Sequence, residues 1–554
     1  MAGALPTIQV AFAGHNRPND LRGRRALSRD LAAAFAMLKA AGVDSARLVS
    51  GFASGADELA LAVWKDAGLG PAHIVFPFLT DGVAGEIGPA GLAQAATWLD
   101  GAAAEAAGRN AHLQQTRWLL AAAELLIVVW TGAQARGAGG TADAVRLALE
   151  RGLPVLWIKP AAPGLLRLIR PPEAEEGFDF TEFLESGGRD RLELATPEGL
   201  REALRQGNGS ALELPAEDGA WRRIDGWLHR WLWKTYLVFC RLAGGPPLRD
   251  DQHPAAPPDL AAQPGFQALT KAYEAADARA NRLAAVHRSE QILLLLGMVA
   301  AAVVGSSPAL WPGLKLGAVL MELALSVAAL FIWLTAARAH QHERWSELRR
   351  FAEQLRLERA AWAAGVTALH PGRMAAFAEH SVLGHDAVRR AGPPLGRFDG
   401  ERARRWGAWA MAELVGGQAA YHRHLSSRDG RIARRIHLIE DVSFVVLLLV
   451  LASYAFADLL AQPPHWAGGV VVIAGTVIPA IGAATMALEA KLEFEDQSLR
   501  SRIIAAKLEA LQLELGERPT STAMQGAARK AIRWLSAEAD QWREGAARRR
   551  LFRP

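Results

Sequence analysis

Two pairs of long apolar segments limit what this chain can fold into more than any other feature. Residues 291–310 and 315–337 form the first pair, and residues 441–460 and 468–488 form the second. Each segment is close to the ~20 apolar residues that a helix needs to cross the hydrocarbon core of a bilayer. The turn inside each pair is short and contains proline, so each pair predicts a transmembrane hairpin. The sequence therefore predicts a membrane protein with four spans.

The basic residues surround these hairpins. Arg and Lys side chains flank both pairs where the chain enters and leaves them, whereas the turns carry almost no charge beyond Lys315. By the positive-inside rule, the flanks and both termini are cytoplasmic and the turns lie outside. The net charge of +5 and the pI of 9.5 then reflect topology and attraction to anionic lipid, not binding of a nucleic acid polymer. The richness in Ala, Gly, Arg and Leu suits a bacterial chain, so we expect the inner membrane.

The two hairpin regions resemble each other in sequence. Tyr273 and Tyr421 precede the hairpins at similar distances, and Arg282-Leu283-Ala284 parallels Arg431-Ile432-Ala433. A repeat spacing of about 150 residues predicts a duplication. The predicted hairpin units are residues 266–370 and 416–554, with a helical connector at 371–415.

Ionisable side chains inside spans are candidates for function by default. Glu322 lies inside the second span and Asp458 near the outer end of the third. If copies of the chain assemble around an axis, Glu322 lines a cation path; otherwise it lies near the outer interface. We expect a homo-oligomer, and we expect Asp458 at the interface.

The first 160 residues predict an α/β Rossmann-like domain. Short apolar segments alternate there with helical patterns, which is typical of a parallel sheet covered on both faces by helices. The predicted strands are residues 8–13, 47–50, 73–78, 125–130 and 154–158. The first residues lack the basic and apolar regions of a signal peptide. Residues 161–265 predict an irregular and helical connector.

Three loops follow strands of this predicted sheet. At such positions glycine lets the backbone approach a ligand, and helix N-termini offer free N–H groups. The candidate ligand-binding residues are Gly14, His15, Asn16 and Arg17 in the first loop, Gly51, Ser54, Gly55 and Asp57 in the second, and Thr131, Gly132, Gly139, Gly140 and Thr141 in the third. Three such loops at one sheet edge predict an anionic, nucleotide-like ligand. Arg17 and Arg136 either contact its phosphates or are solvated loop side chains.

The same loops resemble the SLOG superfamily, a Rossmann-like group that includes DprA, the LOG enzymes and sensors of nucleotide second messengers. The matching segments are Val-Ala-Phe-Ala-Gly-His-Asn-Arg-Pro (10–18), Val-Ser-Gly-Phe-Ala-Ser-Gly-Ala-Asp-Glu-Leu-Ala (49–60) and Gly-Gly-Thr-Ala-Asp-Ala-Val (139–145). LOG enzymes carry a hydrolytic Glu three residues after the Thr of the third motif. Ala144 stands at that position here, and Asp143 is displaced by one. The resemblance therefore implies a cyclic nucleotide or an ADP-ribose derivative that is bound without turnover.

The hairpin half resembles the SLATT family of two-span effectors, which occur with SLOG domains or nucleotide-synthesising enzymes in bacterial conflict systems. The copy at 266–365 matches through His-Glu-Arg-Trp (342–345) and Ala-Glu-Gln-Leu-Arg (352–356), and the copy at 416–515 matches more loosely. The resemblance implies a pore or membrane-disrupting effector in antiphage defence by abortive infection. Two alternatives stay open: a membrane-anchored LOG-like enzyme that processes nucleotides, and a scaffold that binds a protein partner.

Two further observations concern the remaining residue types. Cys240 is the single cysteine, which excludes an intrachain disulfide and a Cys-based zinc site, and the histidines form no predicted metal site. Residues 221–242 combine several Trp with Arg and Lys. Such an amphipathic helix either lies at the membrane interface or packs onto the soluble domain.

Overall fold

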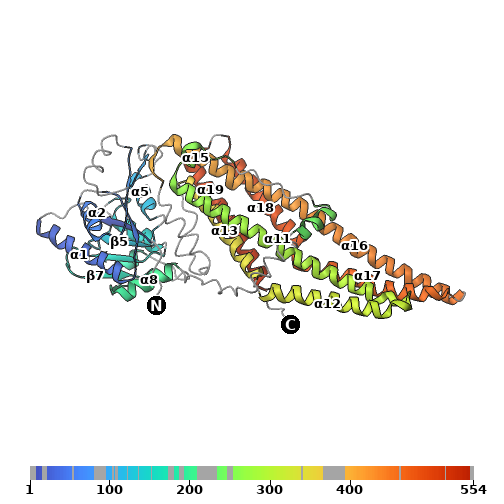
Figure 1. Cartoon of the computed structure of the whole chain (residues 1–554). Coiled ribbons are helices and arrows are strands. Elements are labelled where there is room, and N and C mark those ends of the chain that lie inside the picture. Colours follow the sequence, from blue (N-terminus) through green and yellow to red (C-terminus); the bar gives the residue numbers. More distant parts are fainter. Residues whose placement is uncertain are drawn as a thin grey trace.

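The computed structural model contains an α/β domain at one end and a long helical region at the other (Figure 1). It describes all residues except 1–7, 15–20, 53–54, 80–94, 101, 103–104, 106–109, 121–122, 135–136, 151, 172–179, 186–191, 209–233, 246–253, 339–340, 366–393, 461–462, 518 and 549–554.

The described residues of the α/β domain form a nine-stranded sheet in the order β8-β7-β6-β5-β1-β2-β3-β4-β9. The strands are β1 (Ile8–Gly14), β2 (Ala46–Ser50), β3 (Ala72–Phe76), β4 (Ala95–Leu99), β5 (Leu125–Val129), β6 (Val155–Ile158), β7 (Leu166–Ile169), β8 (Leu192–Leu194) and β9 (Gly396–Phe398). In the part of this order that runs β6-β5-β1-β2-β3-β4-β9, neighbouring strands are parallel. The pairs β6–β7 and β7–β8 are antiparallel.

The mostly parallel α/β sheet predicted from the sequence is confirmed, and its five predicted strands correspond to β1, β2, β3, β5 and β6. The sheet also extends past residue 160, because β7 and β8 add to one edge. At the other edge, β4 lies between two predicted strands, in a stretch where none was predicted, and β9 comes from the connector between the hairpins. Strands β8 and β9 have three residues each, too few for a clear apolar pattern.

Helices cover both faces of the sheet, as continuous apolar strands require. The covering helices are α1 (Leu21–Ala40) and α2 (Ala56–Ala67) on one face, and α5 (Ala111–Leu119) and α6 (Thr141–Glu150) on the other. Side chains of β1 alternate between the two cores: Phe12 packs with α1 and α2, whereas Ala11 belongs to the core of α5 and α6. Burying one large side chain such as Phe12 stabilises the fold by about 1.5–3 kcal/mol. On the first face, α8 (Pro197–Asn208) packs against α1.

The helical region contains two units of three helices. Their bounds are α11 (Pro264–Ser306), α12 (Lys315–Arg338) and α13 (Gln341–Ala363) in the first unit, and α16 (Gln418–Leu460), α17 (His465–Leu492) and α18 (Phe494–Leu515) in the second. Both α11 and α16 have 43 residues, and α13 and α18 have 23 and 22. In each unit the first helix packs against the second and the third. Matching order and lengths are what the predicted duplication requires.

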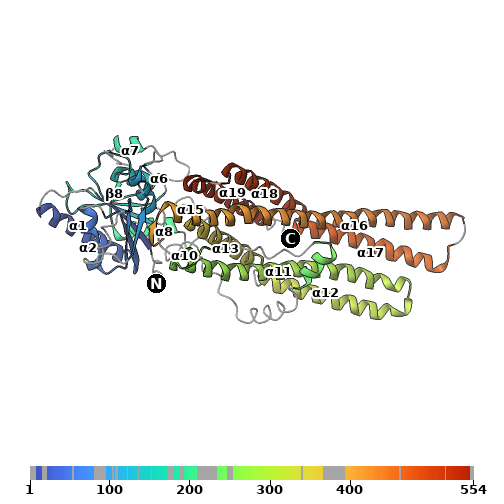
Figure 2. The ribbon, with the colours of Figure 1, turned by 90° about the horizontal axis from the view of Figure 1, so that it is seen from above.

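Among the described residues, four helices are long and apolar enough to cross a membrane, as the sequence predicted. They lie in the order α12, α11, α17 and α16 (Figure 2). The two hairpins approach closely at their tips, since a Cβ on Gly469 would lie 2.6 Å from the carbonyl oxygen of Ala309. Only 11%, 6%, 0% and 11% of the most apolar windows, in chain order, are buried. A single copy therefore leaves its apolar helices for lipid or for other copies to cover.

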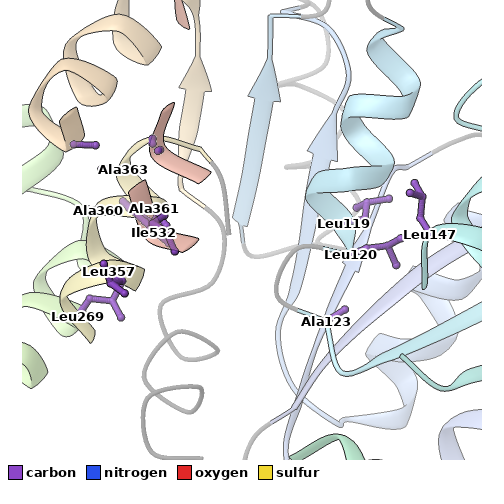
Figure 3. Packing of buried hydrophobic residues seen from close by; sticks show 14 of the residues in the cluster. Leu119, Leu120, Ala123, Leu147, Leu269, Leu357, Ala360, Ala361, Ala363 and Ile532 are labelled. Carbon is purple, nitrogen blue, oxygen red and sulfur yellow. The ribbon is translucent and has the colours of Figure 1, made fainter. Parts of the chain in front are cut away.

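Two further helices, α15 (Gly400–Met411) and α19 (Ser521–Arg548), join the helical region to the sheet. Strand β9 leads directly into α15. One hydrophobic cluster continues across this junction, and Figure 3 shows its residues from α5 and α6 opposite those from α11, α13 and α19. The ring centroid of Phe398 in β9 lies 5.3 Å from that of Trp118 in α5 and 5.7 Å from that of Trp406 in α15. The two parts of the chain are thus packed together, not merely tethered.

Candidate functional site

The strand order reverses at the centre of the sheet, between β1 and β5. β1 pairs in parallel with β2 on one side and with β5 on the other. Ligands of open α/β sheets bind outside the carboxyl ends of the strands at such a reversal. Because these strands are parallel, Gly14 at the end of β1, Gly51 after β2 and Thr131 after β5 all lie at the carboxyl ends of the strands. The topology thus brings the described parts of the three predicted loops together.

The first two loops approach each other across Asp57, a buried residue in the first turn of α2. A Cβ on Gly14 would lie 2.5 Å from the Cβ of Ala56 and 3.5 Å from Oδ1 of Asp57. A Cβ on Gly51 would lie 3.5 Å from Oδ2 of the same carboxylate, and Gln115 of α5 donates to the Gly51 carbonyl at 3.1 Å. The approach to Ala56 therefore requires glycine at position 14, whereas a Cβ on Gly51 would mainly displace Gln115 Nε2, which would lie 2.8 Å away. Asp57 lies at ordinary contact distance from both positions.

The second loop contains a backbone conformation that the sequence did not reveal. Phe52 has φ 53°, in the left-handed region. That conformation costs an L-residue roughly 1–2 kcal/mol, and such strain concentrates at functional sites. The Phe52 ring is half-buried and meets Phe76 edge to face at 6.1 Å. Gly55, with φ 115°, then directs the chain into α2. Nothing in the residue pattern marks Phe52 beyond its place between Gly51 and Gly55.

The third loop is fixed against α5. Gly139 has φ 85°, and a Cβ there would lie 2.4 Å from the backbone nitrogen of Leu113. Thr116 donates to the Gly139 carbonyl at 3.1 Å, and the Gly139 N–H donates to Asp143 Oδ2 at 2.8 Å. Asp143 therefore closes the loop from the first turn of α6. Ala144, at the position of the LOG glutamate, is buried in the core.

Three helix N-termini lie at this edge, because α2, α5 and α6 each run back from it. The N-terminus of α5 is capped by Asn110, whose side chain accepts from the Leu113 N–H at 2.9 Å. Gly140 and Thr141, at the start of α6, are half-buried, and Thr131 is exposed. Free N–H groups and the helix dipole at such positions favour an anion. Of the other predicted residues, Gly132 has φ 90°, and His15, Asn16, Arg17, Ser54 and Arg136 lie outside the described residues.

A buried histidine, His73, lies at the opposite end of the strands from the three loops, near the amino end of β3. His73 Nε2 is 2.7 Å from Thr97 Oγ1, and that hydroxyl donates to the Pro394 carbonyl just before β9. Burial, together with the charge of Arg47, lowers the pKa of His73 to about 3, so the imidazole is neutral. This arrangement holds β9 onto the sheet. In the described part of the chain, no three His, Cys, Asp or Glu side chains form a group that could hold a metal ion.

The helix that leads from β9 to the third long apolar segment is continuous over Gly400–Leu460. It includes α15, a π-helical segment η5 (Ala412–Gly417) and α16. π-Helical segments are rare and occur frequently at functional sites. Within η5, Glu413 accepts from Arg359 of α13 at 2.6 Å, and both side chains are buried. The Arg359 guanidinium also stacks on the rings of Tyr273 and Trp409 at 4.7 and 5.4 Å.

The two ionisable residues in the spans lie toward the hairpin turns. Glu322 is exposed in α12, and its Oε2 would lie 2.8 Å from a Cβ on Gly305, near the end of α11. Asp458 is exposed two residues before the end of α16. A single chain thus leaves the Glu322 carboxylate near the turn of the first hairpin, against the backbone of its partner helix.

Comparison with known proteins gives one match. A family model described as "Protein of unknown function (DUF4231)" matches residues 271–372. The matched region covers most of α11 and all of α12 and α13, and it agrees with the SLATT-type resemblance of residues 266–365. No curated protein and no solved structure matches the chain. The chain therefore contains a DUF4231 region of SLATT type next to a mostly parallel α/β sheet domain.

Proposed function

We propose that this chain is a membrane effector gated by a nucleotide-derived second messenger. The ligand, a cyclic nucleotide or an ADP-ribose derivative, binds at the strand-order reversal of the α/β domain, which acts as a SLOG-type sensor. Binding opens a homo-oligomer of the four-span region, which then forms a pore or disrupts the bacterial inner membrane. The sensor and both termini are cytoplasmic. The outcome is abortive infection in antiphage defence.

The observation that carries this proposal is the unbroken path from the sheet to a span. β9 is hydrogen-bonded into the sheet beside β4, and the chain runs from it through α15 and η5 into α16. No flexible linker separates these elements. A change in the position of the sheet edge is therefore transmitted to a membrane helix.

The first unit is connected to the same helix. Asp259, just before α11, accepts from Arg405 and from Trp406 Nε1 of α15, both at 2.9 Å. Because α15 contacts the start of α11 and leads into α16, one displacement of α15 acts on both hairpins.

Gating requires that the ligand bind the open assembly more tightly than the closed one. Coupling free energies between sites are typically 1–3 kcal/mol, and interactions made only in one state must supply them. The glycines let the loop backbones pack close to the N-termini of α2 and α5, so a ligand at the carboxyl ends of the strands contacts backbone from several elements at once. Movement of α2, α5 and α6 relative to each other would then depend on occupancy.

The test is release of a fluorescent dye from liposomes that contain the purified full chain. A panel of cyclic mononucleotides, cyclic dinucleotides and ADP-ribose derivatives is added to wild type and to Thr141→Glu. A carboxylate at the start of α6 suits the helix dipole but repels an anionic ligand by about 1–3 kcal/mol at an effective dielectric constant near 20. The midpoint of dye release should therefore rise by about 10- to 100-fold.

The matched control is Ser45→Glu, which adds the same charge in an exposed position before β2, at the opposite edge of the sheet. Its dye-release midpoint should equal that of wild type. Release that responds to no ligand, with new products in the mixture, would favour the LOG-like enzyme. Equal sensitivity of both variants would place the ligand elsewhere and refute the assigned site.

A further inference from the structure

A short helix of the connector, residues 234–242, lies far along the helical region (Figure 2, short green helix beside α11). We call it the connector helix. The chain leaves the α/β domain after α8 and returns by Pro254, whose carbonyl accepts from Trp409 Nε1 of α15 at 2.8 Å. The connector helix lies between these two points in the sequence, but it packs against the helical region and not against the sheet.

One face of the connector helix is buried against both hairpin units. Tyr236 and Cys240, one helical turn apart, pack in a cluster with residues of all four neighbouring helices. The cluster residues from those helices are Ile292 of α11, Ile432, Ala433 and Ile436 of α16, Leu488 of α17 and Phe494 of α18. The hydroxyl of Tyr236 accepts from Arg288 of α11 at 3.4 Å and from Arg428 of α16 at 3.3 Å.

These contacts fix the depth of the connector helix. The predicted spans begin at residues 291 and 441 and the fourth ends at 488, so Ile292 and Leu488 mark the cytoplasmic limit of the apolar segments. The connector helix is therefore held at the level where the spans enter the cytoplasmic leaflet.

The opposite, exposed face of the connector helix is more apolar than a face in contact with water usually is. The exposed residues are Lys234, Leu237, Val238, Arg241 and Leu242, which lie on one side at the i, i+3, i+4, i+7, i+8 spacing of a helix. The three apolar side chains are exposed by 40%, 52% and 76%. A helix on the surface of a water-soluble domain places polar residues at these positions.

Basic groups surround this apolar stripe. Lys234 and Arg241 lie on the stripe itself, and Arg435 of α16 donates to the Leu242 carbonyl at 3.2 Å. Arg431 and Arg434 of the same helix are exposed at the same level. An apolar stripe with cationic side chains is the composition of a helix that lies in the interface of an anionic membrane.

We infer that the connector helix is an interfacial anchor whose Leu237, Val238 and Leu242 side chains insert into the cytoplasmic leaflet, with the surrounding basic groups contacting anionic phospholipid headgroups. Its occupant is lipid, because the stripe continues the exposed apolar surface of α16 and α17 at the point where those helices enter the bilayer. The inference depends on the bilayer placement of the four helices and not on the ligand.

The inference is tested by spin labels on the full chain in liposomes that contain phosphatidylglycerol. Single-cysteine variants Leu237→Cys, Val238→Cys and Leu242→Cys are made on a Cys240→Ala background. Power saturation then compares collisions of each label with oxygen, which is enriched in lipid, and with a water-soluble nickel chelate. Phe444→Cys, exposed in the span of α16, is the lipid control, and Asp66→Cys, exposed on α2, is the water control.

We expect the oxygen-to-nickel ratio at the three connector positions to exceed that of Asp66→Cys several-fold and to approach that of Phe444→Cys. Ratios equal to the water control, with Phe444→Cys still in lipid, would overturn the anchor while leaving the spans in place. A water-like ratio at Phe444→Cys itself would instead overturn the membrane placement on which the proposed function rests. Liposomes of phosphatidylcholine alone should lower the ratio at the connector positions, whereas an unchanged ratio would refute the role of the basic groups.

Discussion

Replacing Glu413 with Gln should destabilise the junction between the two hairpin units more than any single change of a surface charge. Glu413 lies in the π-helical segment η5 and accepts from Arg359 of α13 at 2.6 Å. The two side chains are 2% and 5% exposed. Glu413→Gln keeps an oxygen acceptor of nearly the same shape but leaves the Arg359 charge buried without its counter-charge.

The expected magnitude follows from that burial. Removing one partner of a buried ion pair costs about 3–5 kcal/mol, because the remaining charge stays desolvated. The amide oxygen of the Glu413→Gln variant would still accept a hydrogen bond, and the rings of Tyr273 and Trp409 still face the Arg359 guanidinium, each worth up to about 2 kcal/mol. We therefore expect the low end, about 3 kcal/mol, or about a hundredfold in the unfolding equilibrium.

The assay is chemical unfolding in detergent micelles, followed by tryptophan fluorescence. The Trp409 ring stacks on the Arg359 guanidinium, and Trp362 and Trp406 belong to the same hydrophobic cluster as Trp409, so three of the 18 tryptophans report on this junction. The matched control is Arg423→Gln, which breaks a pair with Glu509 whose side chains are 66% and 43% exposed. That loss should stay between about 0 and 1 kcal/mol. Equal effects of the two variants would refute the argument that burial, not pairing, sets the cost.

Three further outcomes are expected. Burial lowers the pKa of His73 to about 3, so the unfolded chain binds a proton below pH 6.5 that the folded chain does not. Stability is therefore lost as the pH falls from 6.5 toward 3. His73→Gln should lessen that loss in unfolding curves taken across this pH range. Burial raises the pKa of Glu538 to about 7, so stability is lost as pH rises through about 7, and Glu538→Gln should raise the melting temperature above that pH but not near pH 4.5. If Glu322 lines a cation path, Glu322→Gln should lower the cation selectivity of ligand-evoked currents in planar bilayers, whereas unchanged selectivity would place this residue outside the path.

The parts of the fold that the sequence predicted are those with a strong local signal. Five buried strands could be recognised because each is a short, mostly apolar run bounded by Gly or Pro, and the four long apolar helices because each contains about 20 apolar residues with almost no charge. Strand β9 could not, because Gly396–Phe398 has three residues and becomes a strand only by pairing with β4. The π-helical segment depends in the same way on long-range contacts, including the bond from Arg359 to Glu413.

For the candidate site, the sequence predicted where the loops lie but not what each of their residues does. The glycine-rich loops that follow strands placed Gly14, Gly51 and Gly139 at the carboxyl ends of the strands, where the structure has them, because parallel strands end together. The sequence did not distinguish residues that face a ligand from residues that hold the loops. Asp57 is buried beneath two loops, and Asp143, displaced by one residue from the LOG position, bonds to the Gly139 N–H. Such roles depend on where a neighbouring backbone lies, which no local pattern contains.

The duplication gives the two hairpins different positions with respect to the sheet. The second hairpin is a covalent continuation of β9 and α15, whereas the first is held by side-chain bonds from Asp259 to α15 and by packing of α11 against α17. Asp259→Asn should therefore weaken the connection of the first unit while leaving the second unbroken. If both hairpins must move for the membrane to open, this variant should reduce the maximum extent of dye release without shifting the ligand concentration at half-maximum. If the second hairpin alone opens the membrane, the variant should behave as wild type. If α15 moves both hairpins, the maximum extent of dye release should fall in this variant. Behaviour like wild type would instead confine gating to α16 and α17.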